Sequence, residues 1–108
     1  HELRDELLSL PGIGQETADV LLLYVFDQPV FVSDTYARRL FEKLAPRTSY
    51  PTYQSLARKL PQAQMAAFNL AEAQDFHGQI DEFGKLWLRG GDRFSDSFLK
   101  DFQIELEV

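Results

Sequence analysis

The segment Leu10-Pro11-Gly12-Ile13-Gly14-Gln15-Glu16-Thr17-Ala18 lies between two stretches with helical periodicity and decides the fold. Before it, leucines at positions 3, 7 and 10 recur at spacings of four and three residues, which predicts one apolar stripe on a helix. Pro11 and Gly12 end that helix. After it, residues 15–26 are apolar on almost every side, which predicts a second helix that is buried on most faces.

The two glycines suit a tight turn that leaves backbone amides accessible. Gly12 and Gly14 permit backbone angles that other residues avoid, and they keep side chains out of the path of a ligand. We expect Ile13 to point inward and anchor the turn. The amides of both glycines and of the following helical turn should point outward, which makes an anion site. A plain helix–helix turn is the alternative, and two glycines alone are more typical of it.

The rest of the chain has helical periodicity, with no stretch that reads as a sheet. A short extended connector is expected at 30–32, and Asp34 precedes the next helix. Further helices are expected at about 35–44, 51–60 (with Pro51 in the first turn), 62–88 and after Ser95. We therefore predict an all-α fold and a single unit over 1–108, in which 1–27 form two helices joined by the glycine hairpin and 28–108 form a C-terminal helical part.

Composition excludes several classes of site. The chain has 108 residues, 44% of them hydrophobic, which is enough for one small core. It has no Cys and two His, so disulfides, thiolate nucleophiles and iron-sulfur ligands are excluded, and neither a metal site nor another cofactor is expected. The longest apolar run, 20–26, is too short to span a bilayer. No signal peptide is visible, and we expect a location in the bacterial cytoplasm or nucleoid.

The net charge of −6 argues against a broad surface for a polyanion. Residues 1–60 carry seven Lys or Arg and eight Asp or Glu, whereas residues 61–108 carry four and nine. A nucleic-acid site is therefore expected in the first half, where backbone dipoles and a few arginines would do the binding.

The decisive segment resembles the helix-hairpin-helix motif of DNA-binding proteins, whose hairpin amides hold a DNA phosphate. Farther on, Val30-Phe31-Val32-Ser33-Asp34-Thr35-Tyr36-Ala37-Arg38-Arg39-Leu40 resembles the Gly/Pro-Asp part of the helix-hairpin-helix (HhH-GPD) DNA glycosylase superfamily. The stretches 76–80 and 83–85 are similar to the C-terminal helix of endonuclease III and its 3-methyladenine DNA glycosylase III relatives. The resemblance covers about residues 3–88 and concerns the C-terminal part of that fold.

This resemblance implies a base-excision repair glycosylase that acts on double-stranded DNA carrying a damaged base. It implies that Asp34 is the catalytic residue. It also implies that the DNA phosphate is bound by Gly12, Ile13, Gly14, Gln15 and Thr17.

Two departures from endonuclease III matter. Glu16 stands where bifunctional relatives have a catalytic lysine, and a carboxylate cannot form the Schiff base of the lyase reaction. The chain also lacks the four cysteines of the family's iron-sulfur cluster, and Leu88 falls near the first of them. Both point toward monofunctional hydrolysis, with an alkylated purine as the favoured base.

Several alternatives stay open. Asp34 could be an ordinary helix cap, although a cap can also hold a catalytic carboxylate. The chain could be a noncatalytic helix-hairpin-helix module that only binds DNA, or a helical domain for protein interactions. His77 and the aromatic residues at 76, 83, 87 and 94 are expected to be packed rather than functional. Arg38 and Arg39 could reach phosphates or lie on a solvated face.

The chain opens inside a helical pattern without an initiator methionine, so we expect a fragment that lacks most of the family's N-terminal lobe. Such a fragment should be inactive alone and should self-associate through exposed apolar faces.

Overall fold

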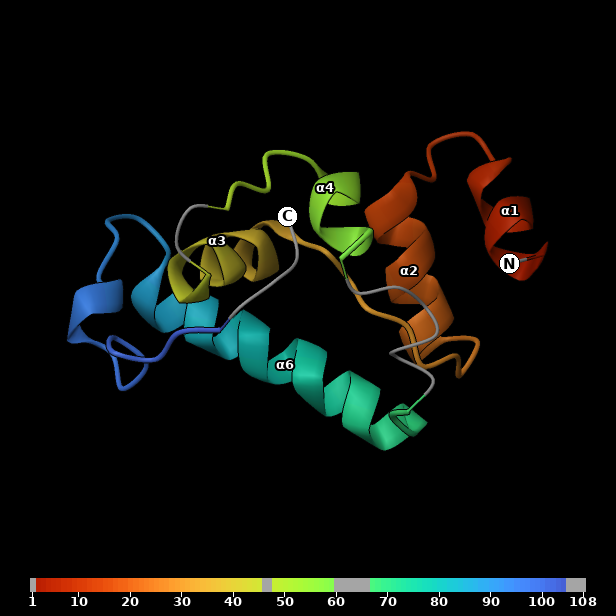
Figure 1. Ribbon diagram of the computed structural model, residues 1–108. Coiled ribbons are helices and arrows are strands. Elements are labelled where there is room, and N and C mark those ends of the chain that lie inside the picture. The colour runs from red at the N-terminus through yellow and green to blue at the C-terminus, as the bar shows by residue number, and fades with distance from the viewer. Residues whose placement is uncertain (1, 46–47, 60–66, 105–108) are drawn as a thin grey trace.

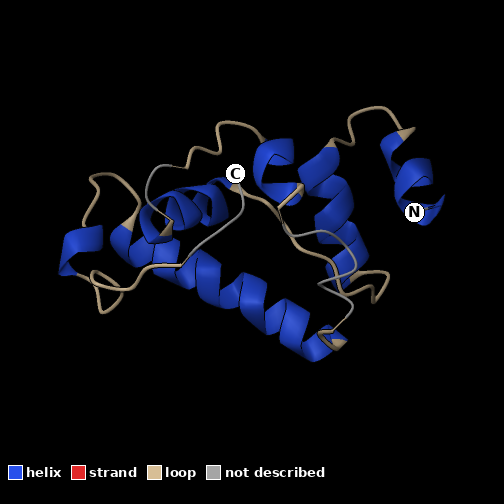
Figure 2. Cartoon of the chain, viewed as in Figure 1, coloured by secondary structure: helices blue, strands red, loops and turns tan. Residues whose placement is uncertain are grey.

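The computed structural model describes residues 2–45, 48–59 and 67–104, and all regular structure within these ranges is helical (Figure 2). The all-α prediction is thereby confirmed for the described part of the chain. The helices in chain order are α1 (Glu2–Leu8), α2 (Gln15–Tyr24), α3 (Thr35–Leu44), α4 (Tyr53–Ala57), α6 (Leu70–Trp87) and the 3₁₀ turn η1 (Phe94–Asp96).

The long helix α6 is the element on which the others are arranged, with α2 beside its first half and α3 beside its second half (Figure 1). At the first contact, the Gln74 side-chain amide donates to the Leu23 carbonyl at 2.9 Å. At the second contact, Gly84 faces Tyr36, and a Cβ at position 84 would lie 2.2 Å from Cγ of that ring. The missing side chain therefore allows α3 and α6 to approach closely.

The core lies between α6 and the three helices α2, α3 and α4. The connector 30–32 runs through it with all three side chains buried and no strand partner, as the sequence predicts. Helix positions that are fully or almost fully buried include Ala18, Leu22, Leu23, Ala37, Leu56 and Ala73.

Helix α2 ends two residues earlier than predicted, at Tyr24. The amides of Val25 and Phe26 both donate to the Leu21 carbonyl, which closes the last turn, and Asp27 then adopts a φ of +53°. The residues at this end are exposed (Tyr24 by 45%, Val25 by 61%), so the prediction that the helix is buried on most faces is wrong here.

Helix α6 begins at Leu70 rather than at position 62. Asn69 caps it, because its side chain accepts from the Glu72 amide while the Glu72 carboxylate accepts from the Asn69 amide. Residues 67–69 are not helical, and residues 60–66, with the predicted end of the preceding helix, lie outside the described residues. The helix runs unbroken through Gly78 and Gly84.

The prediction of a last helix after Ser95 is wrong for the described residues. The chain forms only η1, in which the Phe94 amide donates to Asp92 rather than to a cap at Ser95. The Ser97 hydroxyl then donates to the Phe94 carbonyl and competes with helical pairing. Phe98 consequently lies on the surface, 82% exposed.

Candidate functional site

The turn between α1 and α2, residues 9–14, has two glycines in different conformations. Gly12 has a φ of +82°, in the region that side chains disfavour. Gly14 has a φ of −91° and is the N-cap of α2. Between them, Ile13 packs against the core, and its amide donates to the Leu10 carbonyl at 3.2 Å. The Ile13 amide is therefore engaged within the turn.

The remaining amides of this hairpin are available. Gly12, Gly14, Gln15 and Thr17 are exposed, and their amides donate to no other group within the described part of the chain. No atom lies within 4 Å of where a Cβ would sit on either glycine. Unpaired amides at the N-terminus of a ten-residue helix, in open space, can hold an oxyanion such as a phosphate.

Asp34 is the N-cap of α3, as its place in the sequence predicts. Its Oδ1 atom accepts from the Ala37 amide at 2.8 Å, and its Oδ2 atom lies 3.8 Å from Nδ1 of His77. The Asp34 side chain is 15% exposed. One carboxylate oxygen therefore fixes the group, while the other faces the imidazole of His77.

A buried polar cluster joins the hairpin helix to the residue that precedes Asp34. Asp19 on α2 is 5% exposed, accepts from Nε of Arg4 at 2.7 Å and accepts from the Tyr53 hydroxyl at 2.6 Å. The fully buried Ser33 donates through its hydroxyl to the Tyr53 carbonyl at 2.8 Å. Burial, and then the hydrogen bond to Asp19, raise the pKa of Tyr53 well above its ordinary value.

Sequence reasoning missed this cluster and the position of His77. An aspartate within an otherwise apolar helix was a signal for the former, because a buried carboxylate needs partners. His77 was expected to be packed, and the structure does place its ring against Tyr24, with 5.8 Å between centroids. Its proximity to Asp34 depends on how α3 and α6 pack, which local periodicity does not reveal.

The predictions for the aromatic residues are confirmed: Phe83 and Phe94 are buried, and Phe76 and Trp87 pack against the core. Both arginines after Asp34 have partners in the chain. Arg38 donates to the Pro51 carbonyl at 3.0 Å, and Arg39 donates to the Leu88 carbonyl at 3.0 Å. Arg39 thus contacts the C-terminal end of α6.

The site near Leu88 does not fit an iron-sulfur cluster. The chain has no cysteine, and Leu88 is a buried apolar residue. No group of three or more His, Asp or Glu among residues 2–45, 48–59 and 67–104 is placed to hold a metal ion. No helix in the described ranges is long and apolar enough to cross a membrane.

Comparison with known proteins gives one family match, the helix-hairpin-helix motif, over residues 3–24. A protein of Methanocaldococcus jannaschii, named as a candidate DNA repair glycosylase, is 55% identical over 42 residues, which are 39% of this chain and 19% of that protein. An endonuclease III of Thermotoga maritima is 32% identical over 84 residues, 75% of this chain and 36% of that protein. An endonuclease III of Sulfolobus acidocaldarius is 41% identical over 56 residues, 52% of this chain and 25% of that protein.

The matched regions thus span from about a fifth to about a third of the length of these relatives. No solved structure gives a significant match.

Proposed function

Because this chain belongs, over the region that matches, to the helix-hairpin-helix DNA glycosylase superfamily, we propose that the protein releases a damaged base from double-stranded DNA by hydrolysis. The observation that carries the proposal is Asp34: its carboxylate is fixed by a helix N-terminus through Oδ1, and its Oδ2 atom is not used by the cap and lies 3.8 Å from Nδ1 of His77. The hairpin amides supply the second part of the site.

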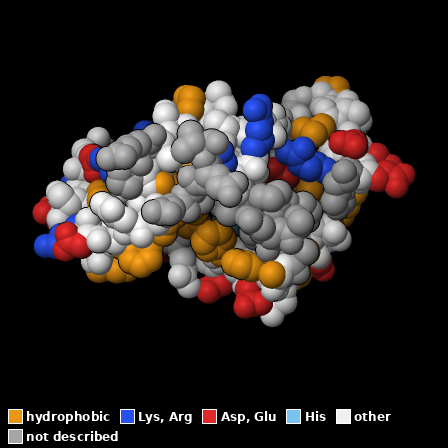
Figure 3. All heavy atoms as spheres, in the orientation of Figure 1, with side chains coloured by type: hydrophobic (Ala, Val, Ile, Leu, Met, Phe, Trp, Pro, Cys, Tyr) orange, Lys and Arg blue, Asp and Glu red, His pale blue; other side chains and the backbone are white. Residues whose placement is uncertain are grey.

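The hairpin would hold one DNA phosphate without reading the sequence. The distribution of charge supports this role. Among the described residues, three basic side chains form ion pairs: Arg4 with Asp19, Lys43 with Asp92 and Lys85 with Asp81. On the face in Figure 3 the few Lys and Arg side chains form small groups, the largest near the top of the molecule, and Asp and Glu side chains lie beside several of them. Backbone amides are therefore better suited than a basic face to bind the phosphate.

The reaction would take place on a nucleotide flipped out of the duplex, because the glycosidic bond is inaccessible within the stack. The bond between C1′ and the base nitrogen breaks, and its electron pair leaves with the base. Asp34 stabilises the positive charge that develops on the sugar. A water oxygen bonds to C1′, and its proton passes to Asp34 or to solvent.

Hydrolysis without strand cleavage is favoured because Glu16 provides no amine for a Schiff base. Glu16 is exposed in the first turn of α2. An alkylated purine fits a site of this kind, since its cationic base is a good leaving group and needs little general acid. We therefore propose a monofunctional glycosylase with this substrate preference.

A noncatalytic DNA-binding module is the second candidate, and one observation favours it: Asp34 makes an ordinary N-cap hydrogen bond. The two candidates differ in one substitution. Asparagine caps helices about as well as aspartate, so Asp34→Asn should retain the fold and the cap while removing the charge.

The experiment is base release by the full-length protein from duplexes that carry alkylated, oxidised or deaminated bases, with Asp34→Asn alongside. The glycosylase proposal expects base release that needs alkali to nick the strand and that disappears in the variant. DNA binding without release from any of these lesions would show that Asp34 is only a cap. Strand cleavage without alkali would contradict the monofunctional proposal.

A further inference from the structure

His77 lies where three helices meet. It is on α6, its ring packs edge-on against Tyr24 at the end of α2, and its Nδ1 atom faces Asp34 at the start of α3. The side chain is 19% exposed. The helix cap uses Oδ1 of Asp34, and Nδ1 of His77 faces the other oxygen, Oδ2.

Rotation about the Cα–Cβ and Cβ–Cγ bonds is what moves the free oxygen of a capping aspartate. The Ala37 amide holds Oδ1 of Asp34 at 2.8 Å. This single hydrogen bond fixes one oxygen but does not fix the orientation of the carboxylate plane. A second contact at Oδ2 would remove this freedom. The 3.8 Å separation exceeds a hydrogen bond, but catalytic contacts commonly shorten when substrate binds.

The position of His77 is itself fixed by neighbouring contacts. One turn before it, the Gln74 amide donates to the Leu23 carbonyl at 2.9 Å, and the Tyr24 hydroxyl donates to the Gln74 carbonyl at 3.4 Å. The end of α2 is therefore tied to α6 next to the imidazole. These contacts fix the backbone of α6 at this point, and the ring itself packs against Tyr24.

We propose that His77 is a positioning residue for base excision: its Nδ1–H donates to Oδ2 of Asp34 in the substrate complex and orients the carboxylate toward the sugar. The proposal rests on the glycosylase function proposed above. It places a proton on Nδ1 of the imidazole, and it gives a residue in the reaction to α6, which carries neither the hairpin nor Asp34.

The kinetic test measures single-turnover base release and DNA affinity in the full-length protein. His77→Ala should slow release by between about tenfold and a hundredfold, because a misdirected catalytic group has a cost of this size, and should leave DNA affinity unchanged. His77→Asn should restore most of the rate, since its side-chain N–H can take the place of Nδ1–H. Gln79→Ala, an exposed change on the same helix, is the matched control and should have no effect.

A rate for His77→Ala equal to that of the wild type would overturn the proposal. So would an equal loss in His77→Ala and His77→Asn with a matching loss of thermal stability, because a structural role alone would then explain it.

A spectroscopic test is independent of activity. The imidazole nitrogens of His77 can be assigned in the full-length protein from the resonances that disappear in His77→Asn. The ¹⁵N resonances of Nδ1 and Nε2 should change in Asp34→Asn, which removes the charge that the ring faces. Unchanged resonances would overturn the pairing itself. Changed resonances in a protein that releases no base would instead reject the proposed function, and with it the role of His77 in that reaction.

Discussion

Gly12 and Gly14 are two residues apart, yet they serve different purposes. The φ of +82° at Gly12 is a requirement of the turn itself, whatever binds there. Gly14 has an ordinary φ of −91° and no atom within 4 Å of where a Cβ would sit, so neither backbone angle nor space requires glycine at this N-cap. A steric requirement for glycine at position 14 would have to come from a ligand that approaches the hairpin from outside.

Alanine substitutions should separate these two purposes. Gly12→Ala should destabilise the protein by about 1 kcal/mol, because alanine is strained at positive φ. Gly14→Ala should change the free energy of unfolding by less than about 1 kcal/mol, because alanine is a poorer N-cap than glycine but also restricts the unfolded chain. If a phosphate approaches Gly14, the same variant should weaken binding to duplex DNA.

Urea unfolding and a fluorescence binding assay on both variants measure the two effects. A Gly14→Ala variant that is as stable as the wild type and binds DNA equally well would contradict the role of the hairpin in phosphate binding.

At the scale of elements, α6 contains a pair of glycines that provides an internal comparison. Gly84→Ala would place a methyl group against the Tyr36 ring and force α3 and α6 apart, so we expect a loss of about 1–3 kcal/mol in the free energy of unfolding. Gly78→Ala meets no atom within 4 Å and should stabilise the helix by about 0.5–1 kcal/mol. Thermal or urea unfolding gives both values; equal effects at the two positions would show that the close contact is not present in solution.

The elements differ in how far the sequence predicts them. The bounds of α3 follow from Asp34 as a local cap and from its own apolar periodicity, and the structure confirms them. The start of α6 depends on the reciprocal cap between Asn69 and Glu72, which a continuous apolar pattern conceals. The contact between Asp34 and His77 joins residues 43 positions apart, and it depends on the packing of α3 against α6, where Gly84 lies against Tyr36.

The cluster of Arg4, Asp19 and Tyr53 ties α1, α2 and α4 together, and its contribution depends on pH. Tyr53→Phe leaves the buried Asp19 carboxylate without one donor, so we expect a loss of about 1–3 kcal/mol at neutral pH. The pKa of Tyr53 is raised in the folded state, whereas the unfolded chain releases this proton near pH 10. The contribution is therefore fully present below pH 10 and decreases as the pH rises above it.

The measurement is urea unfolding of the wild type and of Tyr53→Phe between pH 7 and pH 11. The difference in unfolding free energy between the two proteins should be constant up to about pH 10 and then diminish. A difference that stays constant to the highest pH would mean that the Tyr53 proton is not held by Asp19.

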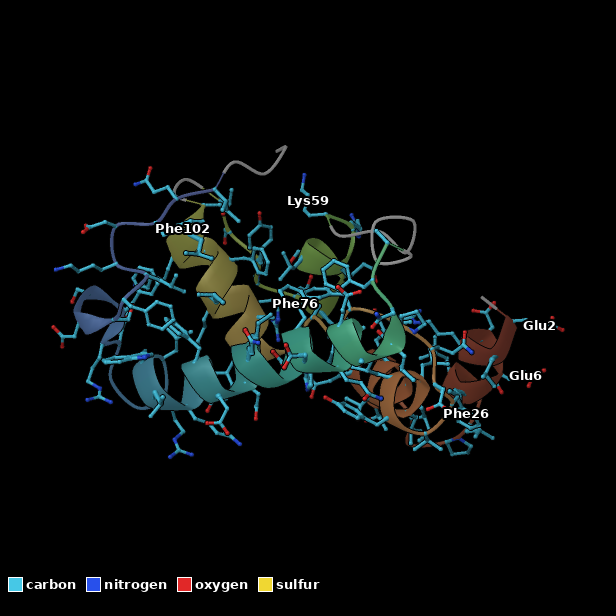
Figure 4. All side chains as sticks on the ribbon, turned by 90° about the horizontal axis from the view of Figure 1, so that it is seen from below. Glu2, Glu6, Phe26, Lys59, Phe76 and Phe102 are labelled. Atoms are coloured by element: carbon cyan, nitrogen blue, oxygen red, sulfur yellow. The ribbon has the colours of Figure 1, made fainter. Side chains whose placement is uncertain are left out.

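For the molecule as a whole, the distribution of apolar surface is as informative as its charge. Hydrophobic side chains gather along the lower edge of the molecule in Figure 3, the side on which α6 lies in Figure 1. Leu86, Phe98 and Phe102 are each more than half exposed. In Figure 4, Phe26 lies near α1 and α2 while Phe102 lies at the opposite end of the molecule, so exposed apolar groups occur at both ends.

This exposure predicts that the 108-residue chain on its own associates in a concentration-dependent way, because association removes exposed apolar surface from water. Phe98→Ser should reduce the association without unfolding the chain, because the Phe98 side chain is 82% exposed and a polar group there remains in water. Light scattering over a range of protein concentrations measures both effects.

The net charge of −6 opposes association at long range, so added salt should strengthen the association by screening that repulsion. A monodisperse monomer at every concentration and salt level would mean that these side chains cover one another in solution and that the exposed surface needs no partner.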